Sequence, residues 1–220
     1  RYLPLHFDLK DRTVLVVGGG EIARRKVDLL LGAEAKVLLI APEVSVELEA
    51  LLAGHVIQKT IYTGLPEGAF ALVVATTGDR SVNESVSLNA RAANIPVNVV
   101  DAPELSTVVF PAIIDRDPVV VSVGSAATSP VLTRSVRELI ETYLPDGVAR
   151  LATYLGDRRE QLKALLPDIE TRRRHTENFL ASPGVRALDT GDRKLADRYL
   201  LAPAPEVVAG EVYLVGAGPG

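Results

Sequence analysis

The stretch that decides the fold is TVLVVGGGEIARRKVDLLLG, residues 13–32. It opens with a β-branched, apolar run of strand length and continues with apolar or long side chains at helical spacing. These are Ile22, Ala23, Lys26, Val27, Leu30 and Leu31. Between the two parts stands Gly18-x-Gly20-x-x-Ala23, in which the first glycine permits a tight turn and the second lets the backbone approach a pyrophosphate. We predict a strand–turn–helix unit that binds a dinucleotide, rather than a turn without a ligand.

Further apolar runs follow and alternate with helical segments. Strands are predicted at 36–42, 70–77 and 95–101, with a less regular one at 55–62. Helices are predicted over 43–52 and after Asp79, whose carboxylate is a predicted N-cap. The strands are continuously apolar, which is typical of a parallel sheet covered on both faces. We therefore predict an α/β fold at residues 1–113, a Rossmann-like, doubly wound parallel sheet.

The pattern changes after Pro111. The run AIIDRDPVVVSVGS, residues 112–125, predicts two short strands around an Asp-Arg-Asp-Pro turn. Ser129 is a predicted N-cap and Pro130 the first position of the next helix. A small α+β region is therefore expected to follow the parallel sheet.

Residues 145–200 are charged and rich in leucine and alanine, which predicts a helical domain with breaks at Pro167 and at 182–184. The run Arg172–Arg174 suits a polycarboxylate ligand, although such runs are more often a solvated helix face. A linker rich in proline and alanine and a short terminal strand are predicted after residue 200.

Composition narrows the class of protein. The 220 residues are 47% hydrophobic and 24% charged, which suits one large or two small globular domains. The formal net charge of −4 gives no case for binding nucleic acid or a membrane surface. No run has the length of a membrane span and no signal peptide opens the chain, so a cytoplasmic protein is expected. Without cysteine and with three scattered histidines, no permanent metal site is expected.

The end of the second strand bears on the cofactor. A ribose-binding acid is expected there, and the sequence has Pro42 followed by Glu43, slightly late. No arginine follows that could hold a 2′-phosphate, which favours NAD over NADP. Thr76, in the predicted strand at 70–77, is also predicted to bind the cofactor.

Two other segments are candidates for binding. NVVDAPE, residues 98–104, places Asn98 and Asp101 at the carboxyl end of a parallel strand, outside which ligands bind. Asp101 could be a general base or bind a cation, and an aspartate that caps the loop explains the pattern equally well. SVGSAATSPVLTR, residues 122–134, could bind an anion, although the local sequence favours an ordinary capped helix start.

Three blocks together resemble the N-terminal module of siroheme synthase. They are LPLHFDLKDRTVLVVGGGEIARRKVDLLL (3–31), NVVDAPELSTVVFPAIIDRDPVVVSVGSAATSPVLTRSVRELIE (98–141) and GEVYLVGAGPG (210–220). The resemblance runs along essentially the whole chain, and its middle block is more specific than the glycine motif.

The resemblance implies an enzyme that oxidises precorrin-2 to sirohydrochlorin with NAD⁺ and then inserts Fe²⁺, as a substrate, to give siroheme. It also implies a homodimer and a downstream uroporphyrinogen-III methyltransferase domain that opens with VGAGPG. Four parts follow: an NAD-binding domain at 1–113, a dimerisation and active-site region at 114–147, a helical domain at 148–205, and a linker with the first strand of a truncated methyltransferase domain at 206–220. A dehydrogenase alone, or an NAD-sensing regulatory dimer without catalysis, stays an alternative.

The resemblance also implies the site. Its key acid is Asp101, as proton acceptor and possible transient Fe²⁺ ligand. Its cofactor-binding residues are Gly18, Gly19, Gly20, Glu21, Ile22, Pro42, Glu43 and Thr76. Its substrate-binding residues are Asn98, Ser125, Thr128 and Arg134. Because precorrin-2 carries several carboxylate side chains, cationic walls are expected, for which Arg134, Arg137 and the run Arg172–Arg174 are candidates.

Overall fold

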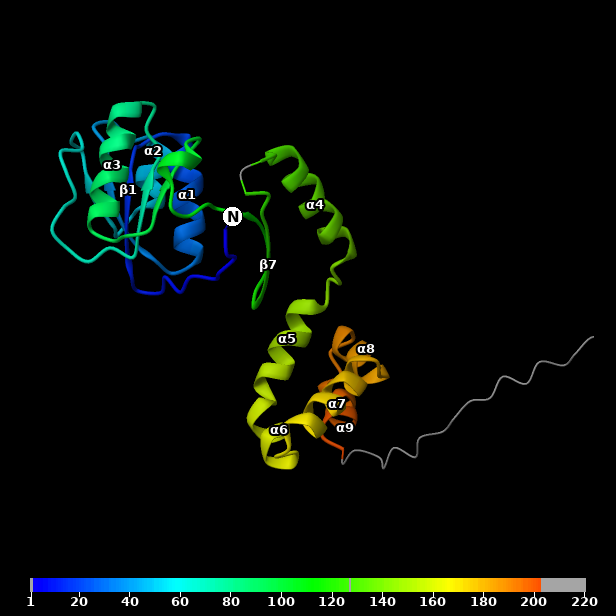
Figure 1. Cartoon of the computed structure of the whole chain (residues 1–220). Coiled ribbons are helices and arrows are strands. Elements are labelled where there is room, and N and C mark those ends of the chain that lie inside the picture. The colour runs from blue at the N-terminus through cyan, green and yellow to red at the C-terminus, as the bar shows by residue number, and fades with distance from the viewer. Residues whose placement is uncertain (1, 127, 203–220) are drawn as a thin grey trace, which may run out of the picture. The chain divides into compact units, whose positions relative to one another are not determined.

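The computed structural model describes residues 2–126 and 128–202 (Figure 1). They divide into two compact units. Unit 1 comprises residues up to 112 together with 123–136, and unit 2 comprises 113–122 together with the residues from 137 onward. The predicted terminal strand and methyltransferase start at 206–220 lie outside the described residues, and the predicted boundaries at 113, 147 and 205 stay a prediction.

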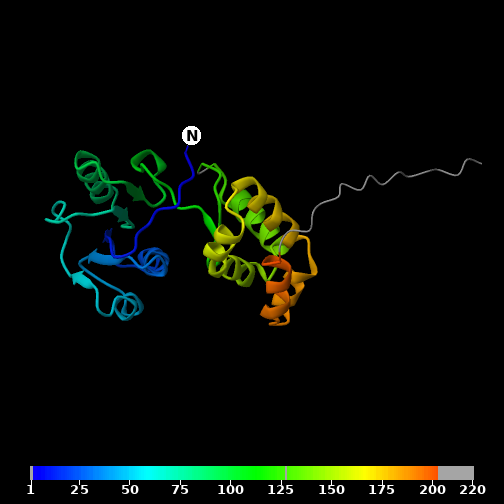
Figure 2. The same ribbon diagram turned by 90° about the horizontal axis from the view of Figure 1, so that it is seen from below.

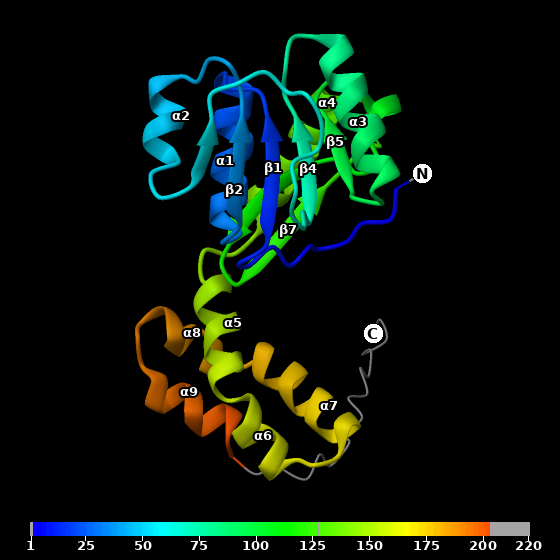
Figure 3. The same ribbon diagram turned by 90° about the vertical axis from the view of Figure 1, so that its left-hand side faces the viewer.

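A single parallel sheet forms the centre of unit 1 (Figure 3). Its strands are β1 (Thr13–Val17), β2 (Lys36–Ile40), β3 (Val56–Gln58), β4 (Leu72–Ala75) and β5 (Val97–Val99). They lie in the order β3-β2-β1-β4-β5, and all four pairings are parallel. Val17 pairs with Ile40 on one side and Ala75 on the other, so the carboxyl ends of the central strands meet at one edge. The predicted Rossmann-like sheet is confirmed.

The predicted strands were too long at their ends. The segments 36–42, 70–77 and 95–101 contribute the shorter strands that end at Ile40, Ala75 and Val99. The residues that follow each strand belong to loops at the carboxyl edge. Ala41 is buried there without being part of a strand, so apolar character alone does not mark where a strand ends.

Three helices cover the sheet. They are α1 (Glu21–Gly32), α2 (Val46–Leu51) and α3 (Arg80–Ala92). Side chains alternate along β1, so Val14 and Val16 pack with α1 and α2 while Leu15 and Val17 pack with α3. Figure 2 shows α1 and α2 on one side of the sheet and α3 on the other. The predicted cap of α3 is confirmed, because the Asp79 carboxylate accepts hydrogen bonds from the first N–H groups of that helix.

After the sheet, the chain forms a two-stranded sheet and a long helix. The strands are β6 (Ala112–Arg116) and β7 (Val119–Val123), which pair as expected for a hairpin. Helix α4 (Pro130–Tyr143) begins at the predicted proline. Ser129 Oγ accepts a hydrogen bond of 3.2 Å from the backbone N–H of Leu132, which confirms the predicted cap.

The remainder of unit 2 is helical. Its helices are α5 (Val148–Asp157), α6 (Arg159–Leu165), α7 (Ile169–Leu180), α8 (Pro183–Asp189) and α9 (Arg193–Leu200). The predicted breaks at Pro167 and at 182–184 are confirmed, because α7 begins after the first and α8 begins within the second. The rings of Tyr154 and Phe179 stack with centroids 5.9 Å apart in the core.

Helices α5 and α9 are also joined by a polar network. Asp197 accepts hydrogen bonds from Tyr154 Oη at 2.8 Å and from two nitrogens of Arg158 at 2.8 and 3.0 Å. The Arg158 guanidinium, supported by the Tyr154 hydroxyl, holds the pKa of the Asp197 carboxyl below its usual value. None of the helices formed by the described residues combines the length and the apolar content needed to cross a bilayer.

Candidate functional site

The glycine-rich turn between β1 and α1 is closely packed on two sides. Gly18 has a φ of 119°, a conformation that favours glycine, and Thr76 lies against it. A Cβ on Gly19 would come within 3.0 Å of both the Ala41 side chain and the carbonyl carbon of Glu43, and nearer still to that carbonyl oxygen. The packing of the turn therefore requires Gly18 and Gly19 even without a bound ligand.

Gly20 differs from its neighbours because its surroundings are open. A Cβ on this residue would meet no atom within 4 Å. Gly20 is also the N-cap of α1 and provides no side-chain cap. The first N–H groups of an uncapped helix lack intrahelical partners and carry the positive end of the helix dipole. The arrangement fits the pyrophosphate of a dinucleotide, which needs backbone N–H donors and close approach.

The loop after β2 is attached to the same turn. The Ser45 N–H donates a 3.0 Å hydrogen bond to the Gly19 carbonyl oxygen. Pro42 and Glu43 precede it, and both are exposed. The Glu43 backbone therefore lies against the glycine turn, and its exposed side chain follows the end of β2, where the sequence predicted a ribose-binding acid.

Thr76 and Glu21 complete the set of predicted cofactor-binding residues around the turn. Thr76 donates to the Val17 carbonyl oxygen through its N–H at 2.8 Å and its hydroxyl at 3.1 Å. Glu21, at the start of α1, pairs with Arg24 and Arg25, and these hydrogen bonds lower the pKa of its carboxyl to about 2. The structure thus brings Gly18, Gly19, Gly20, Glu21, Pro42, Glu43 and Thr76 together at the carboxyl edge of the sheet.

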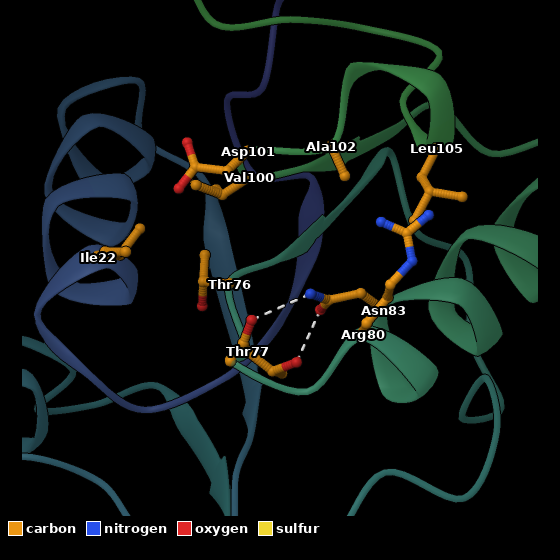
Figure 4. A pocket seen from close by; sticks show the side chains of 10 residues that line it. Ile22, Thr76, Thr77, Arg80, Asn83, Val100, Asp101, Ala102 and Leu105 are labelled. Atoms are coloured by element: carbon orange, nitrogen blue, oxygen red, sulfur yellow. Dashed lines mark hydrogen bonds between the residues drawn. The ribbon is translucent and has the colours of Figure 1, made fainter.

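A cleft of about 210 Å³ opens beside this turn, between α1, β4 and the loop after β5 (Figure 4). Its lining residues come from four segments: Ile22, Thr76, Thr77, Gly78, Arg80, Asn83, Val100, Asp101, Ala102 and Leu105. Figure 4 shows the Asp101 carboxylate and the Thr76 side chain near Ile22, with Arg80 on the other side of the cleft. The predicted acid and two predicted cofactor-binding residues therefore share one cleft.

Sequence reasoning missed the α3 side of this cleft. Asn83 is buried, its Nδ2 donates to the Thr77 carbonyl oxygen at 3.0 Å, and its Oδ1 accepts from the Thr77 hydroxyl at 2.7 Å. Arg80 pairs with Glu84 at 2.8 Å and Glu104 at 3.4 Å. The available signal was Asn83 itself, a polar residue one turn after the Asp79 cap on the apolar face of the predicted helix.

The loop that carries Asp101 is fixed by buried hydrogen bonds. Asp101 has a φ of 58°, a left-handed conformation that aspartate tolerates better than most residues. The buried Ser106 hydroxyl accepts from the Val99 N–H at 2.9 Å and lies 3.1 Å from the carbonyl oxygens of Val99 and Ala102, to which it can donate. From α3, the Ser87 hydroxyl donates to the Leu105 carbonyl oxygen at 2.6 Å. Asp101 therefore projects from a preorganised turn.

Asn98, a predicted substrate contact, lies within β5 and is only 7% exposed. Its Nδ2 donates to the Val108 carbonyl oxygen at 3.0 Å, and the residue does not line the cleft. The amide holds residues 107–110 along the edge strand. The structure thus gives Asn98 a role in positioning the chain, and its contact with a substrate stays a prediction.

The hydroxyl-rich segment before α4 forms a capped helix start, the simpler of the two interpretations of the sequence. Ser125 Oγ accepts from Thr133 Oγ1 at 2.7 Å and from the Ser129 N–H at 3.2 Å. Thr128 and Arg134 are exposed. Among the described residues, the cleft receives no side chain from this segment.

The predicted cationic walls in unit 2 are largely committed to local pairs. Arg137 pairs with Glu141 at 3.0 Å, and Arg172 donates to the Leu166 carbonyl oxygen at 2.7 Å. Arg173 and Arg174 both lie near the Glu170 carboxylate. The run at 172–174 therefore caps and pairs within the helical part, as expected of a solvated helix face. Within residues 2–126 and 128–202, no group of three or more metal-ligating side chains occurs.

Two family models match segments of this chain. Residues 5–112 match a family model described as "Putative NAD(P)-binding", and residues 147–202 match the sirohaem synthase dimerisation region. The parallel sheet, the open glycine turn and the first match together define a protein with a nicotinamide dinucleotide-binding domain of Rossmann type.

The whole chain also aligns with siroheme synthases. It is 44% identical to that of Tolumonas auensis, 41% to that of Pseudomonas aeruginosa and 44% to that of Azotobacter vinelandii. The chain is therefore similar along its whole length to siroheme synthases. It spans about half the length of the curated relatives it matches, with 47% of the first and 48% of the other two.

Comparison with solved structures supports the fold. SirC, a precorrin-2 dehydrogenase, superposes with a TM-score of 0.70, over 90% of this chain and 98% of its own. The two sequences are 22% identical, so this likeness supports the architecture alone.

Proposed function

We propose that this chain binds NAD⁺ and oxidises precorrin-2 to sirohydrochlorin, with Asp101 as the proton acceptor. The main support for this proposal is that Asp101 lines the same cleft as Ile22 and Thr76, beside the open glycine turn. Similarity to siroheme synthases along the whole chain supports the substrate class.

The residues at the turn have separate tasks in this proposal. The N–H groups at the start of α1, next to Gly20, hold the pyrophosphate, and Glu43 hydrogen-bonds a ribose. NAD⁺, when bound, supplies the two-electron acceptor. The negative charge of Glu43 opposes a 2′-phosphate, so we expect a lower Kd for NAD⁺ than for NADP⁺. Glu43→Gln should narrow that difference, measured by calorimetry with both dinucleotides.

Asp101 accepts the proton that the substrate loses, in addition to a hydride, when it is oxidised. A carboxylate suits this task when it is held within hydrogen-bond reach of the substrate and free of strong internal partners. No hydrogen bond or ion pair within 4.0 Å engages the Asp101 side chain among the described residues, while the hydrogen bonds of Ser106 and Ser87 fix its backbone. A fixed backbone with an uncommitted carboxylate is what a positioned base needs.

We further propose that sirohydrochlorin receives Fe²⁺ at the same site, giving siroheme. Metal insertion requires the pyrrole N–H protons to leave, and the Asp101 carboxylate can accept them or guide the incoming ion. Ser125, Thr128 and Arg134 stay proposed substrate contacts. The match of residues 147–202 to a dimerisation region supports a homodimer, which light scattering would test.

The decisive experiment is anaerobic: the chain is mixed with precorrin-2 and NAD⁺, and then Fe²⁺, with absorbance recorded after each addition. Asp101→Asn, which preserves the left-handed turn, should lose most dehydrogenase activity and retain NAD⁺ binding. Glu67→Gln, at the opposite edge of the sheet, is the matched control. Full turnover by Asp101→Asn would remove Asp101 from the mechanism, and NAD⁺ binding without turnover by the unmodified chain would favour a dinucleotide sensor.

A further inference from the structure

Helix α1 carries three consecutive cations, and two of them are neutralised. The Glu21 carboxylate pairs with Arg24 at 2.7 Å and with Arg25 at 3.0 Å, at the spacings where side chains on a helix meet. The third cation is Lys26. Within the described residues, no carboxylate oxygen lies within 4.0 Å of its ammonium group.

Lys26 lies beside the candidate cleft. It follows Ile22, a lining residue, by one helical turn and so shares its face of α1. Its Nζ stands 4.2 Å from the centroid of the Phe110 ring. The pKa of Lys26 is lowered by burial, and the Asp101 carboxylate opposes only part of this shift. The ammonium has therefore lost part of its water without gaining an ion pair.

The aromatic platform under Lys26 is held in place. Asn98 Nδ2 donates to the Val108 carbonyl oxygen at 3.0 Å, and Thr107 Oγ1 accepts from the Val97 N–H at 2.8 Å. Both bonds fasten the segment that ends at Phe110 to strand β5. A cation over an aromatic face keeps its other N–H donors available, because the ring contacts only one side of the ammonium group.

The dinucleotide does not account for this cation. Lys26 stands six residues after Gly20, so it lies about 9 Å further along the helix axis than the expected pyrophosphate position. Asp101 lines the cleft, and its carboxylate acts on the Lys26 ammonium group without forming an ion pair with it. The site thus presents a positive and a negative group that are not paired with each other.

We propose that Lys26 binds a carboxylate arm of the tetrapyrrole substrate while Asp101 faces its pyrrole nitrogens. This inference rests on the proposed function and adds a residue that sets substrate specificity. A ligand that carries both carboxylates and N–H donors satisfies the two groups at once. Binding of a substrate carboxylate gives the partly buried ammonium group an anionic partner. The contact is then a charge-assisted hydrogen bond.

The test uses Lys26→Met, which keeps the side-chain stem on Phe110 and removes the charge, and Lys26→Arg, which restores it. Lys36→Met is the control, because that lysine pairs with Asp11 at the opposite edge of the sheet. Titration with sirohydrochlorin, followed by absorbance, measures ligand binding without turnover. Lys26→Met should weaken this binding at least tenfold and raise KM for precorrin-2 similarly, with kcat within about twofold. Lys26→Arg should recover most of the affinity.

Two results would overturn the assignment. A fall in kcat at unchanged KM would show that Lys26 acts through Asp101, and an equal loss of NAD⁺ affinity would assign it to the cofactor. Urea unfolding checks that Lys26→Met is folded. If the unmodified chain binds sirohydrochlorin in a Lys26-dependent manner but never reduces NAD⁺, the dehydrogenase proposal fails and the Lys26 assignment stands. Absence of sirohydrochlorin binding by the unmodified chain would overturn both.

Discussion

Gly19 and Gly20 are adjacent in the same motif, yet the structure predicts opposite consequences for their replacement by alanine. A Cβ on Gly19 would lie 3.0 Å from two carbon atoms of the β2–α2 loop, where ordinary contact begins at 3.4 Å. The loop must move away, and the Ser45 hydrogen bond to the Gly19 carbonyl oxygen is strained or lost. Overpacking costs about 1–3 kcal/mol and the hydrogen bond about 1 kcal/mol, so Gly19→Ala should lose about 2–4 kcal/mol of unfolding free energy.

Gly20→Ala is the matched control, because its Cβ would enter open space. The free energy of unfolding should fall by no more than about 1 kcal/mol, because alanine is a poorer N-cap than glycine but its methyl group meets no other atom. The methyl group would nevertheless occupy the approach to the first N–H groups of α1. NAD⁺ affinity should therefore fall at least tenfold in a protein whose stability is nearly unchanged.

Hydrogen exchange of peptides from β1 and β2, measured across a urea series, reports the stability of unit 1 separately from that of the helical part. Calorimetry gives the NAD⁺ affinity of each variant. The reasoning is refuted if Gly19→Ala exchanges at the same urea concentration as the unmodified protein. It is equally refuted if Gly20→Ala is destabilised as much as Gly19→Ala.

Two further predictions concern the loop of Asp101 and the helical part. Ser106→Ala removes a buried hydroxyl that bonds three backbone groups, so it should lower the unfolding free energy by about 1–3 kcal/mol, and an unchanged urea midpoint would contradict the role given to Ser106. Because the folded pKa of Asp197 is lowered from 3.8, its stabilising contribution is present above that value and is lost as pH falls through the lower folded pKa. Asp197→Asn should therefore melt at a lower temperature at pH 7, and the difference from the unmodified protein should shrink below about pH 4; a difference that is constant with pH would contradict this.

The parts of the site that depend on local sequence were predictable. A β-branched run before Gly18 and an apolar face after it define strand, turn and helix within one segment, so tertiary contacts were not needed to recognise them. The caps at Asp79 and Ser129 are similarly local, since each side chain bonds N–H groups two or three residues ahead. The pairing of Glu21 with both arginines follows the i+3 and i+4 rule.

The parts that depend on distant segments were not predictable. The sequence left Asp101 open as a base or a loop cap, and its position depends on Ser106 and on Ser87 of another helix. Asn98 belongs to the strand edge, and its amide is directed to Val108 by strand geometry that its residue type does not reveal. The sequence placed Lys26 among the apolar residues that recur along the predicted helix, and only the fold shows Phe110 beneath its ammonium group.

The contact between Gly19 and residue 43 has a consequence for coenzyme engineering. Residue 43 meets the glycine turn through its backbone, and its exposed side chain takes no part in that packing. Most side chains can therefore be exchanged at position 43 with the scaffold intact. Laboratory evolution of the coenzyme preference can explore this position freely, whereas Gly19, against which its backbone packs, must remain fixed.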